Sequence, residues 1–160
     1  MFEYEIVSKS CVNMRRKASA EAKDNNIPVL LENGITAEGF VNEIGNLFGA
    51  NDKLISVDVN DIATLLEGKK SATFGRIRFL KCGDEYTSDD DIAWFENMKA
   101  SAACFFLEGD IKFRKAIKIA EALSEALEED GAFLFSLKCD ENSEKNAIMV
   151  SILAAKERMG

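Results

Sequence analysis

Two aspartates, Asp58 and Asp61, stand where the apolar run "LISVDV" passes into a helix-like run, "NDIATLLEG". Carboxylates about one helical turn apart can face the same direction. Such a pair could orient a water molecule and balance charge during phosphoryl transfer. The same two residues could simply start a helix, since an Asp N-cap contributes about 1 kcal/mol. Both interpretations stay open, because a capping aspartate can also be functional.

Other catalytic chemistries are excluded by composition. The chain has 160 residues and no histidine, so Ser-His-Asp and Cys-His catalysis and His-ligated zinc are ruled out. It also has no glycine-rich phosphate loop. We therefore expect this chain to bind no cofactor and no metal, and to have no catalytic activity alone. An acid–base pair formed by Asp58 and Asp61 remains the weakest alternative.

Charge and cysteine usage indicate the environment of the protein. A net charge of −8 argues against a nucleic-acid surface, which needs clustered cations. No apolar run is long enough for a membrane span, and the first residues do not resemble a signal peptide. Four cysteines without paired spacing are typical of reduced thiols, so we expect a cytoplasmic protein; they are Cys11, Cys82, Cys104 and Cys139.

Two segments have the periodicity of amphipathic helices. Residues 37–48 place apolar side chains at three- and four-residue intervals, with Thr36 as the N-cap and Gly49 as the stop. Residues 110–131 form the stronger helix, and its predicted buried stripe is Phe113, Ala116, Ile117, Ala120, Leu123 and Leu127. Two further helices are expected, one in "NDIATLLEG" and one after the capping pair Ser88 and Asp91.

Four runs are typical of strands, and together with the helices they predict the fold class. They are residues 71–80, 102–109, 131–139 and 146–155. The last two are separated by a polar turn, which favours a β-hairpin, and the strand at 146–155 is a candidate edge for self-association. The prediction is an α+β two-layer sandwich, with a mixed four-stranded sheet covered by helices on one face and preceded by the helix at 37–48.

The N-terminal part is the least regular. We assign residues 1–35 as an extension and residues 36–157 as the main domain. Within the extension, residues 2–7 could form a short strand. Residues 11–25 are rich in Ala, Lys, Glu and Arg, which favours a helix. Residues 27–33 are typical of a short extended segment.

Residues 36–155 resemble the C-terminal half of FtsZ, the tubulin-like division GTPase. Three segments carry the resemblance. The helix 37–48 corresponds to the central helix of the family. "ISVDVNDIATLL" resembles its synergy loop, usually N-x-D-F-x-D-V. The run from "ACFFLEGDIKF" to "NAIMVSILAA" resembles the closing strand–helix–strand–strand unit. The glycine-rich GTP-binding domain of the family has no counterpart in residues 1–35, so the chain resembles the C-terminal domain standing alone.

The resemblance implies roles for individual residues. Asp58 and Asp61 match the acidic positions of the synergy loop, which reaches the nucleotide of the next subunit. They would act on GTP held by a partner, and Ser56 and Asn60 would contribute to binding. Ser56 replaces the usual Asn, and Val59 stands where Phe is common. The implied partner is an FtsZ-like GTPase polymer or another copy of the chain. The alternative is a general interaction or homo-oligomerising α+β module unrelated to GTP hydrolysis.

Overall fold

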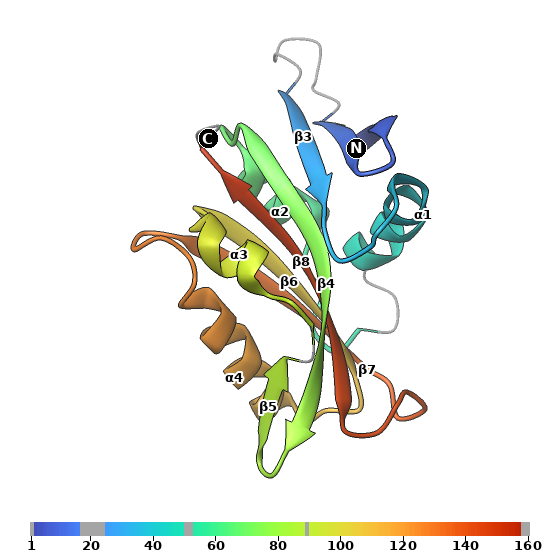
Figure 1. Cartoon of the computed structure of the whole chain (residues 1–160), viewed down its shortest axis with the longest axis vertical. Helices are drawn as coiled ribbons and strands as arrows, with labels where there is room; N and C mark the ends of the chain where they lie inside the picture. Colours follow the sequence, from blue (N-terminus) through green and yellow to red (C-terminus); the bar gives the residue numbers. More distant parts are fainter. Residues whose placement is uncertain (1, 17–24, 50–52, 89, 158–160) are drawn as a thin grey trace.

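A single mixed sheet organises the computed structural model, which describes residues 2–16, 25–49, 53–88 and 90–157 (Figure 1). The strands are β1 (Phe2–Ser8), β2 (Cys11–Arg16), β3 (Asn25–Leu31), β4 (Ser71–Cys82), β5 (Glu85–Ser88), β6 (Ala102–Gly109), β7 (Ala132–Cys139) and β8 (Ala147–Lys156). The helices are α1 (Ala37–Phe48), α2 (Val59–Leu66), α3 (Ala93–Met98) and α4 (Phe113–Ser124).

The strand order is β1-β2-β3-β4-β8-β6-β7, and β5 forms a hairpin with β4. The first three strands form an antiparallel meander, and β3 joins β4 in parallel. Strand β8 pairs antiparallel with both β4 and β6, while β7 pairs parallel with β6. The last strand of the chain therefore lies inside the sheet, and the two outermost strands of this order are β1 and β7.

Helices cover both faces of the sheet. Along β6, Cys104 and Phe106 pack in one core with α1 and α2. Phe105 and Leu107 pack in a second core with α3 and α4 on the opposite face. Because successive side chains of a strand point to opposite faces, each central strand contributes to both cores.

The predicted α+β class with a mixed sheet is confirmed, but two details of the prediction are wrong. The sheet has eight strands instead of four. Its helices lie on both faces instead of one. The reason is the composition of β6 and β8, which are apolar on both sides and almost wholly buried. Such strands need cover on each face.

The expected hairpin between residues 131–139 and 146–155 is also wrong. Strand β8 lies between β4 and β6 and does not pair with β7. Along β8 only Met149 is exposed, as suits a central position. The strand at 146–155 is thus not an edge, and self-association through it is ruled out.

In the N-terminal part, the helix expected over residues 11–25 is wrong for its first half, which forms β2. Val12 and Met14 of this strand are buried at alternate positions. Its backbone pairs with β1 on one side and with β3 on the other. Long-range pairing and burial therefore outweigh the local helix propensity. Residues 17–24 lie outside the described residues.

The strands expected at residues 2–7 and 27–33 are confirmed as β1 and β3. Buried side chains of β2 and β3 share one core with Phe40 of α1. The ring of Tyr4 also lies edge-on against Phe40, with 6.0 Å between the ring centroids. The N-terminal strands thus contact the first helix of the main domain. The division of the chain at residue 35 stays a prediction.

The predicted helices are confirmed with shorter bounds in two cases. Helix α1 begins as predicted, with the Thr36 hydroxyl accepting the Gly39 N–H at 3.1 Å. Helix α4 ends at Ser124, and its predicted buried stripe is wrong in part: Phe113 is 44% exposed and Ile117 is only half-buried, whereas Ile119 is buried. Helix α3 has only six residues.

The predicted capping pair does not form at α3. The N-cap of this helix is Ile92, which makes no side-chain capping bond. Asp91 instead accepts the Ala93 N–H at 2.9 Å through its carboxylate. The left-handed residue Lys99 follows the last turn of the helix.

We expect Gly75→Ala to lower the free energy of unfolding by about 1–3 kcal/mol, the usual cost of overpacking. A Cβ atom at Gly75 in β4 would lie 2.3 Å from Cζ2 of Trp94. Urea unfolding measures the effect. Gly45→Ala is the matched control, because a Cβ atom there meets nothing within 4 Å. On this exposed helix position Ala should stabilise by about 0.5–1 kcal/mol. Equal stability of both variants would contradict the packing of Trp94 on β4.

Candidate functional site

The segment 54–61 is held at its first residues by the edge strand β7. The N–H groups of Leu54 and Ile55 donate to the carbonyl of Leu137, at 2.8 and 3.2 Å. The Leu137 N–H donates back to the Ile55 carbonyl at 2.9 Å. This isolated antiparallel bridge places the segment along the rim of the sheet.

The other end of the segment is held by packing of α2. Val57 is largely buried, and Ile62 and Leu66 of α2 lie in the core shared with α1. Between these fixed points, the residues predicted to function all face solvent. Ser56, Asp58, Asn60 and Asp61 are exposed. The structure thus brings the predicted site residues together on one short exposed segment.

Asp58 is the N-cap of α2, as the sequence predicts. Its Oδ1 accepts the Asn60 N–H at 2.8 Å, and its carbonyl accepts the N–H groups of Asp61 and Ile62. Asp61 lies in the first turn, where a negative charge suits the helix dipole. An ionised carboxylate has about four acceptor positions, so one capping bond does not exhaust Asp58. The cap and a binding role are therefore compatible.

Ser56 and Asn60 have fewer defined contacts. The backbone of Asn60 is engaged on both sides, since its N–H donates to Asp58 and its carbonyl accepts the Thr64 hydroxyl at 2.9 Å. Ser56 is exposed ahead of the buried Val57. The binding roles predicted for Ser56 and Asn60, and the catalytic role in trans predicted for Asp58 and Asp61, stay predictions.

No group of three or more Cys, Asp or Glu side chains in the described part of the chain is placed to hold a metal ion. At the segment 54–61 the chain offers two carboxylates, Asp58 and Asp61. A hard cation such as Mg²⁺ prefers six oxygen ligands. A metal bound at this segment would therefore need further ligands from a nucleotide, a partner or water.

None of the described helices is both long and apolar enough to cross a membrane.

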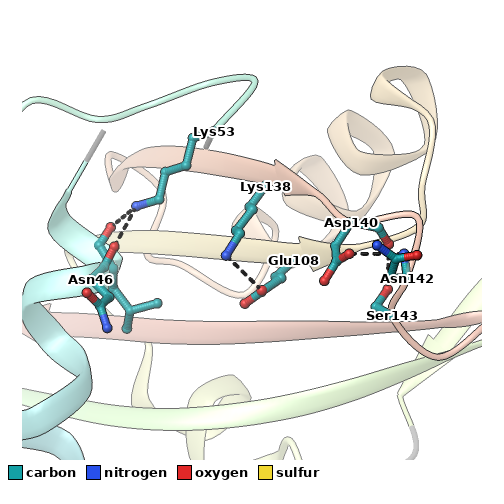
Figure 2. A network of polar contacts seen from close by, with 8 residues as sticks. Asn46, Lys53, Glu108, Lys138, Asp140, Asn142 and Ser143 are labelled. Carbon is teal, nitrogen blue, oxygen red and sulfur yellow. Dashed lines mark hydrogen bonds and ion pairs between the residues drawn. The ribbon is translucent and has the colours of Figure 1, made fainter. Parts of the chain in front are cut away.

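A polar network that the sequence did not predict lies beside α1 (Figure 2). Lys53 Nζ donates to the carbonyls of Asn46, at 3.1 Å, and Leu47, which end α1. The same ammonium group lies 5.9 Å from the ring centroid of Phe106. Partial burial among these groups lowers the pKa of Lys53. Lys53 therefore serves as the positive group at the C-terminal end of α1.

The open part of the same sheet face is lined by charge pairs. Lys138 on β7 pairs with Glu108 on β6 at 3.5 Å. Arg76 on β4 binds Glu43 of α1 and the Ser151 hydroxyl of β8. Together with Lys53 they line a groove of about 670 Å³. Arg76 could have been found from the sequence, since the alternation in "FGRIRF" puts the arginines on one face. The cations that line this groove are already paired with carboxylates or carbonyls of the chain. We therefore interpret these contacts as stabilising the fold.

The fold is similar to that of FtsZ. A structure of an empty FtsZ dimer from M. jannaschii matches 74% of this chain with a TM-score of 0.56 and 18% identity. A single-substitution mutant of FtsZ from the same organism matches 74% with a TM-score of 0.52 and 20% identity. These matches cover 37% and 38% of the FtsZ chains, so this chain spans well under half of their length. No protein-family model and no curated protein matches the chain.

The FtsZ-like fold predicted from the sequence is thereby confirmed. The match covers 74% of this chain but 37% of the FtsZ chain. This chain therefore corresponds to a part of FtsZ, which agrees with the resemblance to its C-terminal half. At 18% and 20% identity the similarity establishes the fold.

We expect Asp58→Ala to destabilise the protein by about 1 kcal/mol, because the Asn60 N–H loses its capping acceptor. Asp58→Asn should cost less than Asp58→Ala, since Asn caps about as well as Asp. Urea unfolding of both variants measures the difference. If Asn proves as costly as Ala, the charge of Asp58 matters for stability and the capping bond does not.

Proposed function

We propose that this chain binds a tubulin-like GTPase through the segment 54–61 and presents Asp58 and Asp61 to the nucleotide held by that partner. One observation carries the proposal. Asp58 and Asp61 are exposed on a segment fixed at one end by the bridge to Leu137 and at the other by the packing of α2. The FtsZ-like fold supports the same conclusion.

The chemistry asked of the two aspartates is positioning. Phosphoryl transfer depends mainly on orienting the attacking water and balancing charge. The bond from the Asn60 N–H holds the Asp58 carboxylate in one orientation and leaves acceptor positions for a partner's water or metal. Asp61, at the third residue of α2, would act beside it. The chain supplies two carboxylates, and the partner supplies GTP.

The test is co-sedimentation and GTP turnover with M. jannaschii FtsZ, or the FtsZ-type GTPase of the source cell, with and without this protein. We expect the wild-type chain to bind and to change filament yield or GTP turnover. Asp61→Asn should weaken the effect about tenfold, the factor that corresponds to 1.4 kcal/mol. Asp58→Asn should do the same, because it keeps the helix cap and removes the charge.

Glu67→Gln is the matched control, because Glu67 is an exposed carboxylate at the C-terminal end of α2, away from Asp58 and Asp61 at its N-terminal end. It should leave binding unchanged. Two outcomes oppose the proposal: no binding of the wild-type chain to either GTPase, or equal binding by the wild-type chain and both aspartate variants.

Self-association is the second candidate function, and one observation favours it. Strand β7 is an edge strand whose first part, "AFLFSL", has no charged residue. Only Leu137 of this stretch is bridged to the segment 54–61 among the described residues. Uncharged edge strands are templates for pairing with another chain. Analytical ultracentrifugation should then give a dimer that Leu134→Lys converts to monomer. A wild-type monomer at high concentration removes this candidate.

A further inference from the structure

An apolar groove lies on the face of the sheet opposite to α1 and α2. It encloses about 600 Å³ between α4 on one side and β5 with α3 on the other. Phe79 and Phe95, which are buried in the core, lie at its base. Ala122 and Ala126 line it from the α4 side. These small side chains, four residues apart, leave room above the floor, so the groove follows the direction of α4.

The rims of this groove carry opposite charges. Lys115 and Lys118 stand on the α4 rim, and Glu85 and Glu96 stand on the opposite rim. Lys115 Nζ donates to the carbonyl of Asp84 at 2.7 Å and so links α4 to the β4–β5 turn. In the part of the chain that the structure describes, Lys118 and Glu96 are exposed and form no ion pair. They are available to an occupant of the groove.

The shape of the groove suits a helix. Lining residues on the α4 side run from Lys115 to Ala126, and the floor between the rims is apolar. At 1.5 Å per residue, this length is roughly 16 Å, or three turns of a second helix. An amphipathic helix has an apolar stripe with polar residues on both flanks. Such a helix would meet Lys118 with one flank and Glu96 with the other.

We propose that this groove binds an amphipathic helix of about three turns from a partner protein, acidic on the flank that faces α4 and basic on the flank that faces α3 and β5. Helix-in-groove recognition places apolar side chains at three- and four-residue intervals in a hydrophobic groove. The charged rims select the occupant by complementarity on both sides. This site is separate from the segment 54–61 and does not depend on its function.

The test uses three capped 12-residue peptides that share one leucine stripe. The first has Glu on one flank and Lys on the other, the second has Glu on both flanks, and the third has Lys on both. Binding is followed by calorimetry and by the fluorescence of Trp94, the only tryptophan, whose ring lies 5.9 Å from that of Phe95. The wild-type protein should bind the mixed peptide about tenfold more tightly than the other two, which equals 1.4 kcal/mol.

Lys118→Glu replaces the exposed cation of the α4 rim with a carboxylate and should shift the preference to the all-Lys peptide by about tenfold. Lys112→Glu is the matched control: it makes the same change of charge at the exposed N-cap of α4, which does not line the groove. It should keep the preference for the mixed peptide. Ala122→Trp fills the groove and should abolish binding of all three peptides, with folding checked by circular dichroism. The proposal is overturned if no peptide binds, if all three bind equally, or if folded Ala122→Trp still binds.

Discussion

The structure depends on the double burial of β8. This strand is hydrogen-bonded to β4 on one side and to β6 on the other, so its backbone groups are satisfied within the sheet. Leu153 and Ala155 point into the core under α1 and α2, while Ile152 and Ala154 point into the core with α3 and α4. A strand that is apolar on both faces is stable only when both faces are covered. The arrangement of all four helices follows from this constraint.

The same arrangement explains why the two aspartates are exposed. Strand β7 lies at the edge of the sheet because β8 occupies the place beside β6. The segment that carries Asp58 forms one bridge to this edge and then turns into α2, whose apolar side packs on the sheet. Core packing uses the apolar residues of the segment, and its polar residues remain at the surface. A helix cap and a partner site therefore coexist on Asp58.

Three polar features of the surface have different physical characters. Beside α1, cations are matched with carboxylates or carbonyls, as between Lys138 and Glu108, so the groove there is internally neutralised. At the groove along α4, the charges of opposite sign stand on separate rims over an apolar floor. On the segment 54–61 two negatively charged residues, Asp58 and Asp61, lie three residues apart at the start of α2. The groove along α4 and the segment 54–61 thus carry charged side chains that are available to another molecule.

The sequence by itself determined the local elements and the position of the two aspartates at the start of a helix. The period of residues 37–48, the cap at Asp58 and the strand-like runs of β4, β6, β7 and β8 could be predicted, because they depend on neighbouring residues. The FtsZ-like fold could be recognised for the same reason. Tertiary structure alone decided that β8 enters between β4 and β6, that Cys11–Arg16 is a strand and that helices cover both faces. These features depend on pairing and burial between residues far apart in the chain, which local propensity does not encode. The groove along α4 was beyond prediction for that reason, since its walls come from three separate elements.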